Sequence, residues 1–248
     1  GMANKAAIIK KIRGEEDNVL LLDAGDIFQG TPYFNFYGGE LEMKLMSEMQ
    51  YDAGTMGNHD FDAGIDGFVK QLPHATFPIL VANYDFTGTA LENKIEQYKV
   101  FQKKNIKVGV FGLGIELKGL VPEKLYEKIQ YLDPVEKAKE MVAILRDKEK
   151  CDYIICLSHL GYQYKDDKIS DVKLAAQTEG IDLILGGHTH TFLDAPVIYK
   201  NFADKEVLIN QVGWAGVWLG RVDIFFEKKR TKKWHSGKPV KVSKKTRE

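Results

Sequence analysis

The chain has 248 residues, of which 44% are hydrophobic and 28% are charged, and its formal net charge is zero. These values are typical of a globular protein. No apolar run approaches the ~20 residues that a membrane-spanning helix needs, so the sequence excludes a helical membrane span.

Apolar periodicity predicts helices and strands in the first half of the chain. The helices are expected over residues 3–16, 40–50 and from about 65 to 71. The strands are expected over residues 19–23 and 78–81, followed by a hairpin of 98–102 and 106–113. Two loops, over residues 24–39 and 57–64, hold several glycines, and the first also holds aromatic side chains. This composition is typical of loops over a site.

The second half of the chain begins with a strong helix start. Asp133 precedes Pro134, and Glu136 lies three residues after the Asp, which is the pattern of an N-cap, a first-turn proline and a capping box. We expect that helix to reach about residue 148. The remaining expected elements are a strand over 153–157, a helix over 172–179, a strand over 181–185 and a β-rich end over 197–242.

The sequence has no internal repeat, no low-complexity segment and no linker, so we expect residues 1–248 to form a single domain. Its βα units and hairpins indicate an α/β (α+β) fold. Either one mixed sheet or two packed sheets, with helices outside, would satisfy this pattern.

The C-terminal end is basic, with ten Lys or Arg against two Glu over residues 227–248. Such a tail can bind nucleic acid or anionic lipid. The alternation over residues 239–243 favours a different interpretation, an edge strand whose lysines block pairing with other chains. We therefore expect no nucleic acid polymer as a partner.

Four short motifs place Asp, Asn or His side chains directly after apolar runs typical of buried strands. The motifs are Gly25-Asp26, Gly57-Asn58-His59-Asp60-Phe61-Asp62, Ser158-His159-Leu160-Gly161 and Gly187-His188-Thr189-His190. Because ligands bind at the carboxyl ends of strands in open α/β sheets, we expect these side chains to lie together. Oxygen and imidazole donors on strand ends can form a metal site.

Each motif alone has a simpler explanation. Asp26 and Asn58 could be turn or cap residues. His159 could be a hydrogen-bonded core histidine, and the His188-Thr189-His190 segment could be a surface loop. The recurrence of such residues after several strands favours a metal site. Carboxylate, amide and imidazole donors without thiolate suit Zn²⁺, Mn²⁺, Fe or Co²⁺ better than Ca²⁺.

The order Gly-Asp, Gly-Asn-His-(Asp/Glu), His, Gly-His-x-His resembles that of the calcineurin-like metallophosphoesterases. Residues 23–26 and 57–62 resemble more specifically the catalytic domain of the 5′-nucleotidase / UDP-sugar hydrolase / 2′,3′-cyclic phosphodiesterase family. The resemblance implies a four-layer αββα sandwich of two mixed β-sheets flanked by helices. It also implies a metal-dependent phosphoesterase that hydrolyses nucleotides or related small phosphate esters by a two-metal hydroxide mechanism.

The resemblance also implies a set of ligands for two divalent metal ions. Carried over by position, Asp26 bridges the two ions. Asn58, His159 and His188 complete one site, and His190 serves the other.

The same resemblance implies a catalytic pair that does not bind metal. His59 is expected to stabilise the developing charge and to help protonate the leaving group. Asp62 is expected to orient His59, because a carboxylate partner keeps an imidazole protonated and aimed. Asp60 is expected to cap the following turn.

One feature of the family is absent before Asp26. The family supplies two ligands of the site shared with His190 from a strand that ends in Asp-x-His, and no Asp-x-His precedes Asp26. We expect the natural protein to carry this strand upstream. The alternative is a metal-binding or partner-binding module that has lost catalysis, because the second ion would then have only Asp26 and His190.

The C-terminal domain with which the nucleotidases stack the base has no counterpart after residue 242. We therefore expect weak base specificity, or a separate nucleotide-recognition domain or chain as a partner. The aromatics of residues 28–37 could contact a substrate, but local packing explains them more simply. Bacterial relatives of this branch are commonly exported, which implies a periplasmic or otherwise exported protein and leaves a cytoplasmic location open.

Overall fold

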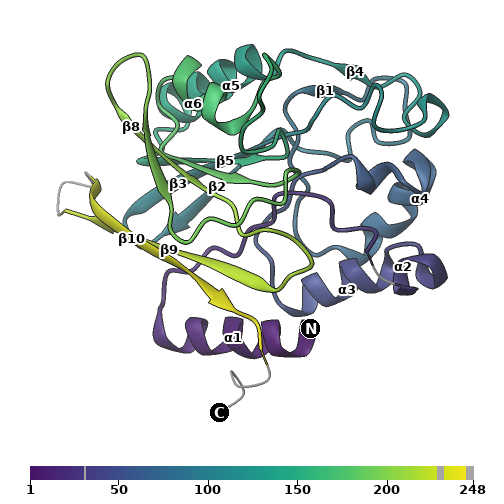
Figure 1. Ribbon diagram of the computed structural model, residues 1–248, viewed down its shortest axis with the longest axis horizontal. Coiled ribbons are helices and arrows are strands. Elements are labelled where there is room, and N and C mark those ends of the chain that lie inside the picture. The colour runs from purple at the N-terminus through teal and green to yellow at the C-terminus, as the bar shows by residue number, and fades with distance from the viewer. Residues whose placement is uncertain (31, 228–231, 244–248) are drawn as a thin grey trace.

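The computed structural model describes residues 1–30, 32–227 and 232–243. Its largest sheet has six strands in the order β2-β3-β5-β6-β8-β7. Figure 1 labels β2, β3, β5 and β8 of this sheet. The neighbours β3, β5, β6 and β8 pair in parallel, and β2 and β7 pair antiparallel at the two edges. The strands are β2 (Tyr98–Lys103), β3 (Ile106–Leu113), β5 (Tyr153–Ser158), β6 (Leu183–Gly186), β7 (Val197–Lys200) and β8 (Glu206–Asn210).

Two helices, α5 (Pro134–Ala143) and α6 (Asp171–Gln177), cover one face of this sheet. Ile154 and Cys156 of β5 pack in the core on this side, together with Met141 of α5. The residues between them face the other side, because successive side chains of a strand alternate.

The opposite face of the sheet packs against a second β layer. Tyr153, Ile155 and Leu157 share a core there with Ala53 and Leu80. The second layer consists of the hairpin β9 (Trp218–Phe226) and β10 (Lys232–Lys241), and of extended segments joined by single parallel bridges. A further short pair is formed by β1 (Tyr84–Asp85) and β4 (Gln130–Tyr131).

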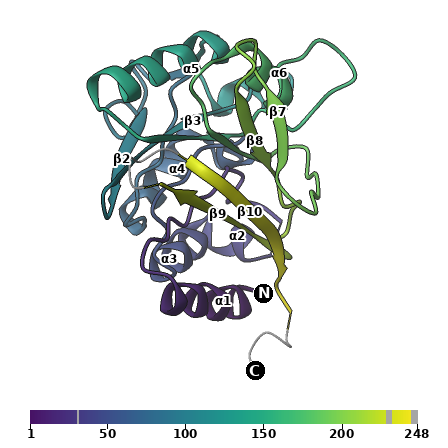
Figure 2. The same cartoon turned by 90° about the vertical axis from the view of Figure 1, so that its left-hand side faces the viewer.

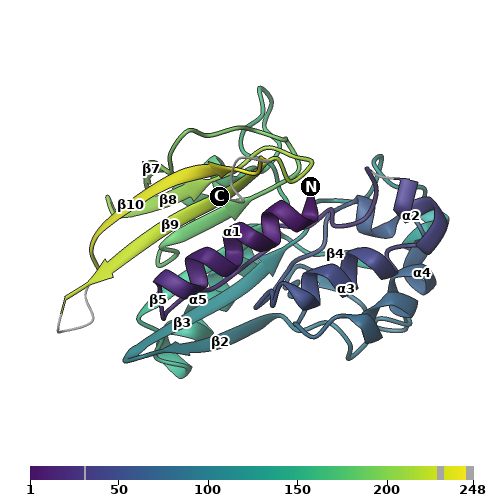
Figure 3. The ribbon, with the colours of Figure 1, turned by 90° about the horizontal axis from the view of Figure 1, so that it is seen from below.

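The helices α1 (Met2–Glu15), α3 (Glu40–Glu48) and α4 (Gly64–Gln71) contribute to a third core outside this layer, with Ile79 packed among them. Figure 2 shows the order from α5 and α6, through the sheet and the β9–β10 hairpin, to α1 and α3. Figure 3 shows α1 beside β9, where Arg221 pairs with Glu16 at 2.9 Å. The α/β fold class expected from the sequence is confirmed.

The second layer is less regular than the strands expected over residues 19–23 and 78–81. Residues 19–23 make one isolated bridge, Leu22 to Ala53, and residues 78–81 make two, Ile79 to Gly54 and Leu80 to Glu96. The first segment turns at Gly25 (φ 88°) into the loop that follows it, which leaves little extended chain for a longer strand pairing. The loop expected over residues 24–39 contains a short helix, α2 (Pro32–Tyr37).

The elements predicted in the second half of the chain are present with small shifts at their ends. The Asp133 carboxylate accepts bonds from the N–H groups of Val135 and Glu136, so the predicted start of α5 is confirmed. A π-helical turn, Ile144–Lys148, continues α5 to the expected end. Residues 239–241 lie in β10, whereas residues 228–231 and 244–248 of the basic tail are outside the described part of the chain.

The parallel strands β5 and β6 bring two of the motifs together at their carboxyl ends. His159 directly follows β5, and its N–H donates to the carbonyl of Leu113 at the end of β3 (2.8 Å). Gly187 directly follows β6, and its N–H donates to the carbonyl of Ser158 (2.9 Å).

Among the described residues, no helix is both long and apolar enough to cross a membrane.

Candidate metal centre

Three side chains from three separate motifs meet at the carboxyl ends of β5 and β6. Asp26, His159 and His188 each offer an atom able to bind a metal, and these atoms lie within 4.8 Å of one another. Asp26 Oδ2 is 2.9 Å from His159 Nε2, and the rings of His159 and His188 have centroids 5.3 Å apart. The carboxylate and imidazole donors fit a divalent transition metal.

The state of His159 supports this fit. Its Nδ1 lies 2.6 Å from the carbonyl oxygen of Ala24 and must be the donor, because a carbonyl can only accept. Nε2 is buried, and no hydrogen bond of good geometry satisfies it despite the nearby Asp26 oxygen. A buried nitrogen that makes no hydrogen bond of good geometry needs an explanation, and a backbone bond at the other nitrogen is how metal-binding imidazoles are oriented.

The pKa values of the histidines in this cluster depend on their burial and on their charged neighbours. Burial lowers the pKa of His159, but the Asp26 carboxylate, the Ala24 carbonyl and the Asp60 carboxylate together raise it, so the net direction is upward. Burial and the neighbouring His159 lower the pKa of His188 to about 4. His188 is therefore neutral at pH 7, which is the form that binds metals.

Asn58 also lies at this cluster. It is buried, and its Oδ1 accepts a hydrogen bond from His188 Nδ1 at 2.9 Å. An amide oxygen and an imidazole from different loops thus adjoin the Asp26–His159 pair. The Asn58 and His188 side chains, predicted to share one ion, are neighbours in the structure.

The Asp60 carboxylate holds two site loops together. It accepts from the N–H groups of Gly57 (2.7 Å) and Asp26 (2.9 Å), and from those of Ile27 and Phe28 (3.1 and 3.3 Å). Burial and the Asp26 charge raise the pKa of Asp60 to about 7, although its backbone donors lower it. The expectation that Asp60 caps the following turn is wrong, because its carboxylate accepts from Gly57 and from residues 26–28, all of which precede it in the chain.

His59 and Asp62 form a pair next to the cluster. His59 Nδ1 and Asp62 Oδ2 are 2.9 Å apart, and the His59 side chain is 47% exposed. The backbone N–H of His59 donates to Asp26 Oδ1 at 2.7 Å. The imidazole is therefore fixed beside the cluster but remains accessible to a ligand.

His190 lies outside the group formed by Asp26, His159 and His188. It is exposed, and its ring stacks on that of Trp214, with centroids 5.6 Å apart and an interplanar angle of 16°. Trp214 was not among the predicted site residues. It lies in a loop with no motif, and its aromatic character is the only feature of the sequence that could have pointed to it.

Close packing explains a glycine of the second motif. A Cβ on Gly57 would collide with the Asp26 carboxylate and with the His159 ring. The approach of Asp26 to His159 therefore requires glycine at this position. The observation also shows how tightly three of the four motifs pack together.

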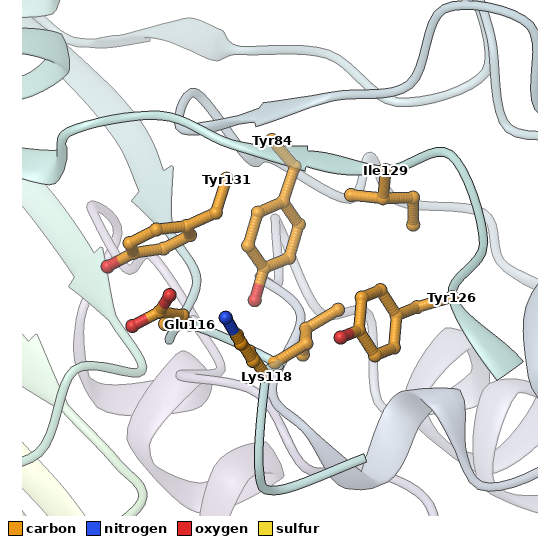
Figure 4. A pocket seen from close by; sticks show the side chains of 7 residues that line it. Tyr84, Glu116, Lys118, Tyr126, Ile129 and Tyr131 are labelled. Carbon is orange, nitrogen blue, oxygen red and sulfur yellow. The ribbon is translucent and has the colours of Figure 1, made fainter. Parts of the chain in front are cut away.

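A cavity of about 190 Å³ lies apart from these ligands. The rings of Tyr84, Tyr126 and Tyr131 line it, with Glu116 and Lys118, as Figure 4 shows. A second cavity of about 500 Å³ shares Glu116 and Tyr131 with it. Neither contains any of the predicted ligands.

The layered fold and the carboxylate–imidazole cluster at its strand ends define an α/β protein built around a candidate metal centre. The profile described as calcineurin-like phosphoesterase matches residues 2–192. The chain belongs to the calcineurin-like phosphoesterase family.

Similar proteins include nucleotide phosphoesterases. The chain is 34% identical over 92% of its length to the trifunctional nucleotide phosphoesterase protein YfkN of Bacillus subtilis (strain 168), and 36% identical over 91% to a 5′-nucleotidase of Vibrio vulnificus (strain CMCP6). The crystal structure of a 5′-nucleotidase precursor from Thermus thermophilus superposes with a TM-score of 0.89 at 30% identity, over 99% of this chain. The chain spans only 17%, 45% and 50% of these three proteins.

Proposed function

We propose that this protein is a metal-dependent phosphoesterase that hydrolyses nucleotides or related small phosphate esters. The observation that carries the proposal is the buried His159 Nε2, which faces Asp26 Oδ2 and lies within the same cluster as His188. Family membership and the names of the relatives support phosphoric ester hydrolysis.

The proposed cofactors are two divalent ions, with Zn, Mn, Fe or Co suited to the donor types. Asp26, Asn58, His159 and His188 would hold one ion, and Asp26 and His190 would contribute to the other. Bound ions of this kind lower the pKa of water and neutralise phosphoryl oxygens. The Ala24 carbonyl fixes the tautomer of His159 that can donate its Nε2 lone pair.

The proposed catalytic pair is His59 and Asp62. Asp62 orients the His59 ring through Nδ1, which leaves Nε2 directed away from the carboxylate. A protonated His59 can donate a proton from Nε2 to the leaving oxygen and stabilise negative charge on the phosphate. Asp60 has a supporting function in this proposal, because its carboxylate holds the loop of Asp26 against the segment that carries His59.

The setting of the whole protein also belongs to the proposal. The residues 1–248 are proposed to form one catalytic domain that acts with a nucleotide-recognition domain or chain. The precursor form of the Thermus thermophilus relative supports a periplasmic or otherwise exported location.

Phosphate release from AMP tests the proposed function. The protein is treated with EDTA, and Mn²⁺ or Zn²⁺ is then added back in molar excess. We expect metal-dependent release, which His188→Ala abolishes and His235→Ala, on the β9–β10 hairpin, preserves. Metal binding without release from AMP or other small esters would contradict the enzyme and favour a non-catalytic metal-binding module.

A further inference from the structure

The loop that carries His188 and His190 has an uncommon backbone conformation. Both histidines have positive φ values, 65° and 53°, in the left-handed region that residues other than glycine rarely adopt. Between them, the N–H of Thr189 donates to the carbonyl of Gly187 at 2.8 Å. Residues persist in this region only where their surroundings impose it, so contacts from outside the loop must hold it.

A buried glutamine supplies contacts of this kind. Gln211 directly follows β8 and is 1% exposed. Its Oε1 accepts from the N–H of Thr191, and its Nε2 donates to the carbonyl of Gly187 at 2.8 Å. The Thr189 hydroxyl also donates to Oε1, at 3.1 Å. One amide group thus joins both ends of the histidine loop and its middle.

The two ends of the loop need opposite hydrogen-bonding groups. The Thr191 N–H needs an acceptor, and the Gly187 carbonyl needs a donor. A side-chain amide carries both on one planar group, whereas an ionised carboxylate has no donor and an ammonium has no acceptor. The amide of Gln211 therefore fixes the separation of the two ends.

The sheet brings Gln211 to the candidate metal centre. The strands β6 and β8 pair in parallel as far as Leu185 and Asn210, so the residues that follow them leave the sheet at the same end. The loop end that Gln211 holds lies against the His159 ring, because a Cβ on Gly187 would be 3.0 Å from His159 Nδ1. His188, which belongs to the cluster, is the next residue in the chain.

We propose that Gln211 is a positioning residue, which holds His188 in place beside Asp26 and His159 and thereby sets the metal affinity of the protein. This inference rests on the proposed function, because it takes His188 as a metal ligand. Gln211 acts only through the loop, since its oxygen and its nitrogen are both bonded to loop residues. Loss of a residue that orients metal ligands typically weakens metal binding about 10- to 100-fold.

A comparison of metal affinity with stability tests the proposal. Gln211→Met keeps a side chain of similar length and removes all three hydrogen bonds. The control is Asn83→Leu, because Asn83 is also a buried amide, and it accepts from the N–H of Gly114 and donates to its carbonyl. The segment held by Asn83 contains no predicted metal ligand. Isothermal titration with Mn²⁺ measures the affinities, and urea denaturation in EDTA measures the stabilities.

Both variants should unfold at lower urea concentrations than the full chain, because each leaves buried backbone groups without their partners. We expect Gln211→Met to weaken Mn²⁺ binding about 10- to 100-fold, and Asn83→Leu to keep the affinity of the full chain. Equal affinity of Gln211→Met and the full chain would overturn the proposal. Equal losses of affinity in both variants would also overturn it, because a general loss of structure would then explain the effect.

Hydrogen exchange gives a second measurement that needs neither a metal nor a variant. The Thr191 N–H donates to the buried Gln211 oxygen, so this amide should exchange slowly in the full chain with EDTA present. Exchange at the rate of an unprotected amide would show that Gln211 does not hold the loop and would overturn the proposal. No Mn²⁺ binding by the full chain would instead refute the proposed function, and the exchange of Thr191 would still decide whether Gln211 holds the loop.

Discussion

At the scale of single residues, the separation of His59 from the metal cluster gives a direct prediction. His59 contacts Asp62 through its side chain and Asp26 only through its backbone. We expect His59→Ala to lower turnover of AMP by about 10²-fold or more, because general acid catalysis contributes on that scale. Metal content, measured by mass spectrometry on the same samples, should stay near that of the unaltered chain. A parallel loss of metal and activity would show that His59 is a ligand.

Asp60 carries a prediction about stability. Its two oxygens accept four backbone N–H groups, and the Asn side chain would turn one acceptor into a donor. We expect Asp60→Asn to lower the free energy of unfolding by about 2 kcal/mol, since buried groups that lose a partner cost about 1–3 kcal/mol. Urea denaturation measures this, with Asp66→Asn on the exposed side of α4 as the control. Equal midpoints for the two variants would contradict this function of Asp60.

The chemical types of the site residues could be predicted from the sequence, but not all of their contacts. Asp26, His159 and His188 follow apolar runs, and the rule about strand ends places such residues together. Three of the four partners of Asp60 lie 32 to 34 residues upstream, and no local pattern indicates that pairing. Trp214 was not predicted for the same reason, because its stacking on His190 depends on how two loops pair.

At the scale of the elements, the junction of β5 and α6 predicts a pH dependence. Asp171 is fully buried, Ser158 donates to its Oδ1, and burial raises its pKa to about 8. The folded protein therefore binds this proton more tightly than the unfolded chain, where Asp has a pKa of about 3.9. Its stabilising contribution is complete below about pH 4 and is lost as the pH rises towards 8.

This dependence can be measured in metal-free protein. We expect the free energy of unfolding of the unaltered chain to fall between pH 5 and pH 8, and Asp171→Asn to reduce that slope because it does not titrate. Asp60 contributes in the same direction up to about pH 7, so the difference between the two proteins is the diagnostic quantity. Urea denaturation of both proteins at intervals of about one pH unit measures this difference in slope. Equal slopes would show that Asp171 is ionised in the folded protein.

Elements with strong local signals were predictable, and elements fixed by tertiary pairing were not. The β2–β3 hairpin and the start of α5 follow from alternation and from the cap at Asp133. The segments around Leu22 and Ile79 look like ordinary strands in the sequence, but the first pairs through one isolated bridge and the second through two. Ladder length depends on the neighbouring segments, which a periodicity argument cannot supply.

At the scale of the whole molecule, the candidate metal centre would link metal binding to folding. Asp26, His159 and His188 come from separate segments and meet only in the folded chain. A metal held there therefore stabilises the fold, by about 2.7 kcal/mol at 100 times its Kd. For a domain of this size, that corresponds to a rise in Tm of roughly 5–10 °C.

Calorimetry with EDTA and with Mn²⁺ tests this link. We expect the rise in Tm for the unaltered chain and for His235→Ala, and little or no rise for His188→Ala. An equal rise in all three proteins would place the stabilising ion elsewhere.

The measurement closest to the central claim is anomalous diffraction from crystals soaked with Mn²⁺. The arrangement of Asp26, His159 and His188 predicts an anomalous peak among their three ligand atoms, with His159 Nε2 bound to the ion. His159 should retain its Nδ1 bond to the Ala24 carbonyl. An empty cluster at saturating Mn²⁺, or an ion bound only by other residues, would contradict the metal centre and the phosphoesterase proposed from it.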